Sequence, residues 1–235
     1  MKKVLLFCLM GLVVVGCKDK KDAIYNEQRS IVTHIFEANN LNPDKTDGRS
    51  DLTELQKSTS FDFDRILVKL DLSNLGITII PPEIGLLTGL VELDLSGNKI
   101  EELPEEIGNL VKLEKLDVRS NRLRGLPSTL GNLESLTELG ISFNRIEKLP
   151  ESIGDLSNLS TLFLAVNKLT ELPESMTKLT NIRYLELGGN DFGIFPAVLT
   201  KMPNLGSVQI DFQSIDTTTI PAGVRSTGHG RYVFD

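Results

Sequence analysis

Most of the chain repeats a single pattern of aliphatic and polar positions. A shift of 23 residues brings a series of Leu-Pro pairs into register. These pairs are Leu103-Pro104, Leu126-Pro127, Leu149-Pro150 and Leu172-Pro173, with Ile80-Pro81 before them and Phe195-Pro196 after them. Self-similarity at a short fixed period predicts a solenoid, in which each unit buries its apolar residues against its neighbours.

Each unit reads L-x-x-L-x-L-x-x-N-x-L-x-x-L-P-x-x-I-G-x-L-x-x. Leu93 and Leu95 alternate with the polar Asp94, so the two leucines share one side of a short strand. We expect the strands of successive units to lie side by side, and the Ile-Gly-x-Leu segment to close each coil as a short helical or irregular stretch. The units begin at Leu67, Leu90, Leu113, Leu136, Leu159, Ile182 and, in degraded form, Leu205.

This pattern resembles the leucine-rich repeat, in its 23-residue form with Leu-Pro and Ile-Gly in the second half. The resemblance implies an α/β solenoid over 67–220, with a curved parallel β-sheet on the concave face and short helical or irregular segments on the convex face. It also implies that one column of asparagines turns inward and bonds backbone groups of its own and neighbouring coils. That column is Asn98, Asn121, Asn144, Asn167 and Asn190.

The two ends of the solenoid carry different patterns. Residues 23–66 begin with apolar residues spaced as on an amphipathic helix, which predicts an N-terminal helical cap. These residues are Ile24, Tyr25, Ile31, Val32, Ile35 and Phe36. Residues 221–235 form the expected C-terminal cap, in which Tyr232 and Phe234 cover the last coil.

The first 22 residues have the pattern of a targeting segment rather than of part of the fold. Residues 1–16 have the basic start and apolar run of a signal peptide. Val14-Val15-Gly16-Cys17 resembles the bacterial lipobox, which implies that Cys17 is lipid-modified and that 17–22 form a charged tether to a membrane. Lipoproteins retained at the inner membrane tend to carry Asp after this Cys. Here the residue is Lys18, so we expect the outer membrane, with periplasmic and surface-exposed display both open.

The composition of the chain argues against several classes of function. The net charge of −7 disfavours nucleic acid as a partner, and two Cys with two His are too few for a Cys/His metal cluster. His34 and His229 fall at opposite ends of the chain, and no nucleophile-elbow or phosphate-loop motif occurs. We therefore expect a protein that is not an enzyme and that has no cofactor and no metal.

The concave wall is where the repeat leaves residue choice open. Its N-terminal part carries an acidic row, Asp71, Asp94 and Asp117, with Lys115 and Arg119 nearby. We interpret this row as solvating the wall, with binding of a cation or an arginine as the alternative.

Farther along the wall the same columns become apolar or aromatic, which is typical of a binding surface. The predicted partner-binding residues are Phe143, Phe163, Val166, Tyr184, Phe212, Glu138, Glu186 and Asp211. The sequence thus predicts a membrane-anchored module that binds a protein at the bacterial envelope. The alternative is a structural envelope lipoprotein or one that contacts glycans.

Overall fold

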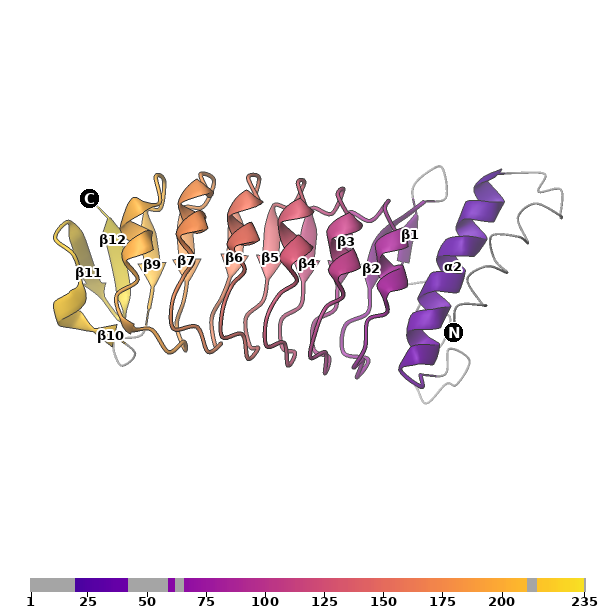
Figure 1. Ribbon diagram of the computed structural model, residues 1–235, viewed down its shortest axis with the longest axis horizontal. Helices are drawn as coiled ribbons and strands as arrows, with labels where there is room; N and C mark the ends of the chain where they lie inside the picture. Colours follow the sequence, from indigo (N-terminus) through magenta and orange to yellow (C-terminus); the bar gives the residue numbers. More distant parts are fainter. Residues whose placement is uncertain (1–19, 42–58, 62–65, 211–214, 235) are drawn as a thin grey trace.

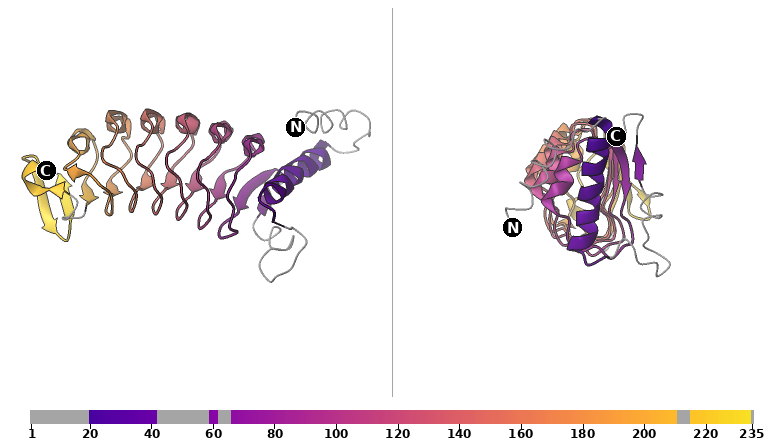
Figure 2. Two further views of the ribbon diagram at one scale, coloured as in Figure 1. Left: turned by 60° about the horizontal axis from the view of Figure 1, so that its bottom comes forward. Right: turned by 90° about the vertical axis from the view of Figure 1, so that its right-hand side faces the viewer.

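The computed structural model describes residues 20–41, 59–61, 66–210 and 215–234. These residues form an elongated, gently arched solenoid with a helix at one end and a β-hairpin at the other (Figures 1 and 2). The predicted signal peptide, the tether residues 17–19 and Cys17 lie outside the described residues.

The main sheet lines the concave side of the arch (Figure 2). In the described residues it contains ten strands in the order β1-β2-β3-β4-β5-β6-β7-β9-β12-β11. The pairs from β2 to β9 are parallel, and β1 and the β12–β11 hairpin are antiparallel. The strands are β1 (Thr59–Phe61), β2 (Leu67–Asp71), β3 (Glu92–Asp94), β4 (Lys115–Asp117), β5 (Glu138–Gly140), β6 (Thr161–Phe163), β7 (Tyr184–Glu186), β9 (Ser207–Gln209), β11 (Val224–Gly228) and β12 (Arg231–Phe234).

The core is a stack of aliphatic side chains, one set from each coil. Leu70, Leu93 and Leu116 occupy the same register position in β2, β3 and β4, and all three are buried. A fully buried aliphatic side chain contributes roughly 1.5–3 kcal/mol. Because a coil buries these residues only against its neighbours, contacts between coils dominate the stability of the fold.

Short 3-10 helices form the convex side, and a proline precedes most of them. Pro104, Pro127 and Pro150 hold the extended conformation that starts each turn. The 3-10 helices are η1 (Pro82–Leu86), η2 (Glu105–Asn109), η3 (Ser128–Asn132), η4 (Glu151–Asp155), η5 (Glu174–Lys178), η6 (Ala197–Lys201) and η7 (Thr217–Thr219). A small two-stranded parallel sheet, β8 (Gly193–Ile194) with β10 (Ile215–Asp216), joins the last coils.

The glycine of the Ile-Gly pair lets neighbouring 3-10 helices approach closely. A Cβ at Gly131 would lie 2.5 Å from the backbone oxygen of Ser152 in the next coil. Gly108 faces the same restriction, at 2.5 Å from the backbone oxygen of Thr129. These glycines are needed for close packing rather than for a left-handed conformation.

The expected asparagine column points inward and bonds the backbone, as the resemblance implied. The Asn121 amide donates to the carbonyls of Leu95 (2.9 Å) and Val118 (3.1 Å), and its oxygen accepts from the Ile100 N–H (3.0 Å). Asn98 and Asn167 repeat this arrangement in their own coils. Each side chain thereby satisfies backbone groups that the bend leaves without partners.

Helix α2 (Lys20–Ala38) covers the N-terminal end of the core. Its buried residues are Ile31, Val32, Ile35 and Phe36, and they join the main cluster. Ile24, which we placed on the same stripe, is 40% exposed. It lies two helical turns before Ile31, near the start of the helix.

None of the helices among the described residues is long and apolar enough to span a membrane.

The C-terminal end is closed by the β11–β12 hairpin, which pairs with β9 through β12. Tyr232 is fully buried, and its ring meets Phe195 edge-on at a centroid distance of 5.7 Å. Phe234 is partly buried, and its ring centroid lies 6.5 Å from that of Phe195. Both aromatic residues therefore cover the last coil as expected.

Candidate partner-binding surface

The central column of the concave wall changes character halfway along the solenoid. Each of its residues lies between two buried positions of a strand, and strand pairing puts them in register. The column reads Asp71, Asp94, Asp117, Gly140, Phe163 and Glu186. The wall is thus acidic over three coils and becomes small and then aromatic over the next two.

The carboxylates of the acidic half bond to their own coils. Asp71 and Asp94 each accept a hydrogen bond from the N–H two residues later, at 2.9 and 2.8 Å. Asp117 accepts from the Arg119 N–H at 3.0 Å. This shared geometry gives the row a structural role in shaping the turn after each strand.

An adjacent column alternates in charge along the same coils. Lys69, Glu92, Lys115 and Glu138 are paired in register in β2 to β5. The Lys69 ammonium lies 2.7 Å from the Glu92 carboxylate, and this hydrogen bond lowers the pKa of Glu92, helped by the charges of Lys69 and Lys115. The N-terminal half of the wall is therefore largely neutralised by its own side chains.

Arg119 crosses from the acidic half toward the aromatic half. Its guanidinium pairs with Asp117 and also lies over the Phe163 ring, 5.5 Å from the centroid. The pairing with Asp117 raises the pKa of Arg119 further. Gly140 makes room for this path, because a Cβ there would lie only 3.2 Å from the Arg119 side chain.

A second arginine covers the other aromatic residue of the wall. The Arg231 guanidinium lies 5.8 Å from the centroid of the Tyr184 ring and donates to the Ser207 hydroxyl at 3.2 Å. Tyr184 is 44% exposed. Its pKa is raised by partial burial and by the charge of Glu186, while Arg231 opposes this shift. The phenol is therefore a neutral hydrogen-bonding group at neutral pH.

The residue before the inward-asparagine slot of each coil, here called the turn position, has a left-handed backbone. In the first coil this slot holds Leu75 in place of asparagine. The φ values run from 56° to 71° over the described coils that carry this turn. The turn positions are Asn74, Gly97, Ser120, Phe143, Val166 and Gly189. Asn and Gly suit this conformation, whereas a bulky or β-branched residue does not.

Phe143 and Val166 are the two exceptions, and both face solvent. Phe143 is 57% exposed and Val166 is 43% exposed. They stand in neighbouring coils, since the Phe143 N–H donates to the Ala165 carbonyl at 2.9 Å and the Asn144 N–H to the Val166 carbonyl at 3.1 Å. A left-handed residue with a Cβ costs roughly 1–2 kcal/mol, so two bulky examples side by side indicate a role outside the fold.

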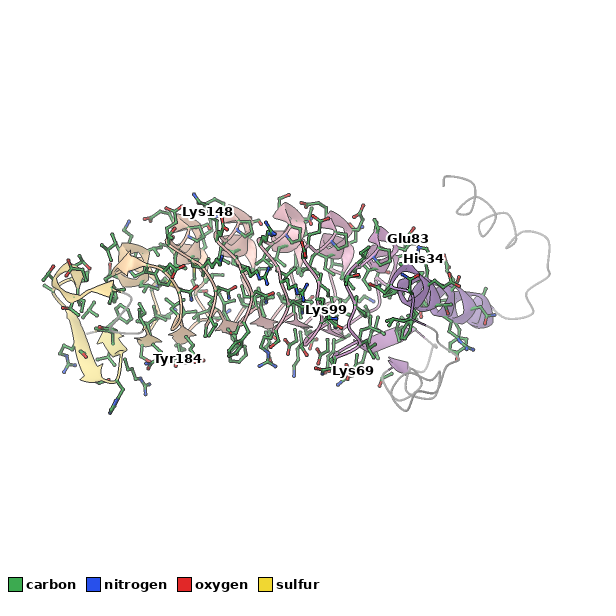
Figure 3. The ribbon with its side chains drawn as sticks, turned by 90° about the horizontal axis from the view of Figure 1, so that it is seen from below. His34, Lys69, Glu83, Lys99, Lys148 and Tyr184 are labelled. Atoms are coloured by element: carbon green, nitrogen blue, oxygen red, sulfur yellow. The ribbon has the colours of Figure 1, made fainter. Side chains whose placement is uncertain are left out.

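The structure brings most of the predicted site residues onto one stretch of wall, from β5 to β7 and the turns that follow. Phe163, Glu138 and Glu186 are half-buried, and Tyr184 is exposed on the same sheet (Figure 3). Phe212 and Asp211 lie outside the described residues. Sequence reasoning did not place Arg119 or Arg231 over the rings. The signal for Arg119 was the glycine that interrupts the aspartate column beside it.

Within the part of the chain that the structure describes, no group of three or more His, Cys, Asp or Glu side chains is arranged to hold a metal ion.

Family and structure comparisons agree with this architecture. A leucine-rich repeat region family matches residues 65–144, and a second leucine-rich repeat family matches residues 131–192. Neither of these families implies an enzyme. A search of curated proteins returned no match.

Several solved structures share the fold. The leucine-rich-repeat protein LIC12759 of Leptospira interrogans is 30% identical over 68% of this chain, with a TM-score of 0.53. The plant peptide hormone receptor RGFR1, solved in complex with RGF2, is 30% identical over 65% of the chain, with a TM-score of 0.58. The ectodomain of the receptor kinase SOBIR1 from Arabidopsis thaliana is 25% identical over 70% of the chain, with a TM-score of 0.56.

The matched regions cover 46% of the Leptospira protein, 28% of the RGFR1 structure and 93% of the SOBIR1 ectodomain. The fold therefore agrees with that of protein-interaction modules such as receptor ectodomains. Together, the two family matches and the stacked coils with their inward asparagine column show that this chain is a leucine-rich-repeat protein.

Proposed function

We propose that this protein binds another protein through the C-terminal half of its concave wall and the turns that border it. The observation that carries the proposal is the pair Phe143 and Val166, which expose apolar side chains from strained backbone positions in neighbouring coils. The fold does not need these residues, because other coils place Asn, Gly or Ser at the same position. Exposed apolar residues next to aromatic rings are typical of the centre of a protein interface.

The surface acts by presenting a preformed shape. The asparagine column and the close packing of the coils fix the backbone on which these side chains stand. Binding therefore requires little ordering of the protein itself, which preserves affinity. RGFR1, a structural relative, is a plant peptide hormone receptor solved in complex with RGF2, which supports a protein or peptide ligand for this type of wall.

The aromatic rings favour a protein partner over a glycan. Stacking on sugars needs an open ring face, and Phe163 and Tyr184 each have one face beneath an arginine. A protein partner would instead contact the whole group, including the guanidinium groups and the rim residue Phe143.

We also propose that the protein is held at the bacterial envelope by lipid on Cys17, at the outer membrane. The lipobox-like Val14-Val15-Gly16-Cys17 and the Lys18 that follows support this. Two acyl signals give stable anchoring where one chain gives only reversible binding. In this arrangement the charged tether would separate the N-terminal cap of the solenoid from the membrane.

The binding proposal is tested by photo-crosslinking in living cells from a reactive amino acid at position 143. The matched control carries the same amino acid at position 74, which is also a turn position, with φ of 58° against 59° at Phe143. We expect a discrete protein adduct at 143 and none at 74. Overexpressed unlabelled wild-type chain should reduce the adduct, and an F143S/V166N chain should not. Equal adducts at both positions, or none at either, would refute the proposal.

The anchor is tested separately by metabolic labelling with a palmitate analogue. We expect label in the wild-type chain and none in Cys17→Ser. Lys18→Asp should retain the label and move the protein from the outer-membrane to the inner-membrane fraction. A labelled Cys17→Ser chain would contradict lipidation, and an unmoved Lys18→Asp chain would contradict the sorting rule.

A further inference from the structure

A row of four basic residues runs along the flank of the solenoid, beside the proposed binding surface. Each follows the inward asparagine of its coil, one per coil in four successive coils. The row is Lys99, Arg122, Arg145 and Lys168, here called the flank row. Figure 3 shows Lys99 between the strand side, where Lys69 and Tyr184 lie, and the 3-10 side, where Glu83 lies.

Backbone hydrogen bonds hold the flank row in register. The N–H groups of Arg122, Arg145 and Lys168 each donate at 2.9 Å to a carbonyl of the preceding coil. The Lys99 N–H does the same at 2.8 Å. The backbone positions of the row are therefore stacked in a line, at a spacing of roughly 4.8 Å per coil.

The flank row is exposed and electrostatically unsatisfied. All four side chains are exposed, and within the described residues none forms an ion pair or a side-chain hydrogen bond. Several other lysines of the solenoid, including Lys69, Lys148 and Lys178, do pair with a carboxylate. A line of unpaired like charges disfavours the isolated protein and is relieved by an anionic partner.

Acidic residues lie near the flank row but do not neutralise its charge. Asp191 occupies the same position in the next coil and ends the row. Two residues beyond each member stand Glu101, Arg124, Glu147 and Thr170, so the neighbouring column is mixed in sign. The row is thus a local basic strip on a chain whose net charge is −7.

The flank row lies next to the exposed apolar pair. Phe143 and Arg145 are two residues apart, as are Val166 and Lys168, so each pair of Cα atoms is separated by at most about 7 Å. An anion bound to the row therefore meets the apolar side chains as well. This combination fits an acidic protein segment with apolar residues, because one extended segment can place carboxylates on the row and apolar side chains on Phe143 and Val166 at the same time.

We propose that the partner presents an acidic segment that lies across successive coils, its carboxylates on the flank row and its apolar residues on Phe143 and Val166. This inference rests on the proposed binding function and adds the charge of the partner to it. Arg122 and Arg145 lie at the centre of the row. A planar guanidinium group can donate two parallel hydrogen bonds to one carboxylate.

The test uses the photo-crosslinker at position 143 in two charge-variant backgrounds of the full chain. The first background is R122Q/R145Q/K168Q. The matched control is K148Q/K178Q/K201Q, which removes the same charge from exposed lysines whose ion-pair partners are also exposed. Circular dichroism and thermal melting establish that both variants are folded.

We expect the flank variant to lose about tenfold or more of the adduct, because it removes three charges that contact the partner. The control should lose less than twofold, because its lysines pair with carboxylates of this chain. Mass spectrometry should place the crosslink in a segment of net negative charge. An adduct of unchanged yield in the flank variant, or a neutral or basic captured segment, would overturn the inference while leaving the proposed protein binding at position 143 intact. Capture of lipid or glycan in place of protein would overturn both proposals. Absence of any adduct in the wild type would overturn both proposals.

Discussion

Replacing Gly131 by alanine should loosen the stack between η3 and η4. The added Cβ would lie 2.5 Å from the Ser152 backbone oxygen and 2.9 Å from its Cβ, well inside ordinary contact distance. Backbone atoms cannot rotate away, so the two coils must separate. Overpacking of this kind costs roughly 1–3 kcal/mol.

Gly125→Ala provides the matched control for this prediction. No atom lies within 4 Å of a Cβ built at Gly125, and its φ is not left-handed. Alanine there should stabilise the chain by about 0.4–1 kcal/mol through the unfolded state. We therefore expect the two variants to differ by about 1.5–4 kcal/mol in urea unfolding, and by roughly 3–15 °C in melting temperature. If G131A proved as stable as G125A, glycine would not set the coil spacing.

Three further predictions address the coil interior, the convex face and the concave wall. Asn121→Ala should lower the free energy of unfolding by about 2–4 kcal/mol in urea titration, because several buried backbone groups lose their partner. The pKa of Glu105 is lowered mainly by two backbone N–H groups of the next coil, so its stabilising effect is present at neutral pH and is lost as pH falls below 4.5. The stability difference between wild type and E105Q should accordingly shrink on acidification, and a constant difference would contradict this. Gly140→Asp should displace Arg119 from Phe163 at a cost of about 0.5–1 kcal/mol, and that cost should disappear in an F163L background.

The repeat made the fold predictable because its period fixes both register and burial. The burial of the leucines at the centre of each strand follows from their spacing, since every coil repeats the same contacts. The inward asparagines follow from the resemblance to the leucine-rich repeat. The cap helix was predictable from its apolar stripe. Ile24 differs because its burial depends on which part of the helix packs against the core, which no local pattern records.

The candidate site was predictable in outline but not in its contacts. Tyr184 was expected on an exposed slot and is exposed. The arginine over Phe163 comes from a coil two units earlier, so it depends on rotamers and on the empty space at Gly140. The strain at Phe143 could not be predicted from the sequence either, because it depends on the left-handed φ angle that the backbone of these coils adopts at this position.

The antiparallel strands at the two ends of the sheet determine whether copies of this protein can polymerise. A stack of parallel strands has open edges onto which a second copy could add its own coil, and identical units could then grow into a fibre. β1 runs antiparallel to β2, so an incoming coil would meet a reversed strand at that edge. At the other edge the outermost strand is β11, which belongs to a hairpin and is mostly exposed and polar, so it does not continue the leucine pattern of the repeat. Neither end of the sheet therefore continues the repeat. Loss of the hairpin that contains β12 would expose the last coil, onto which further copies of the chain could assemble.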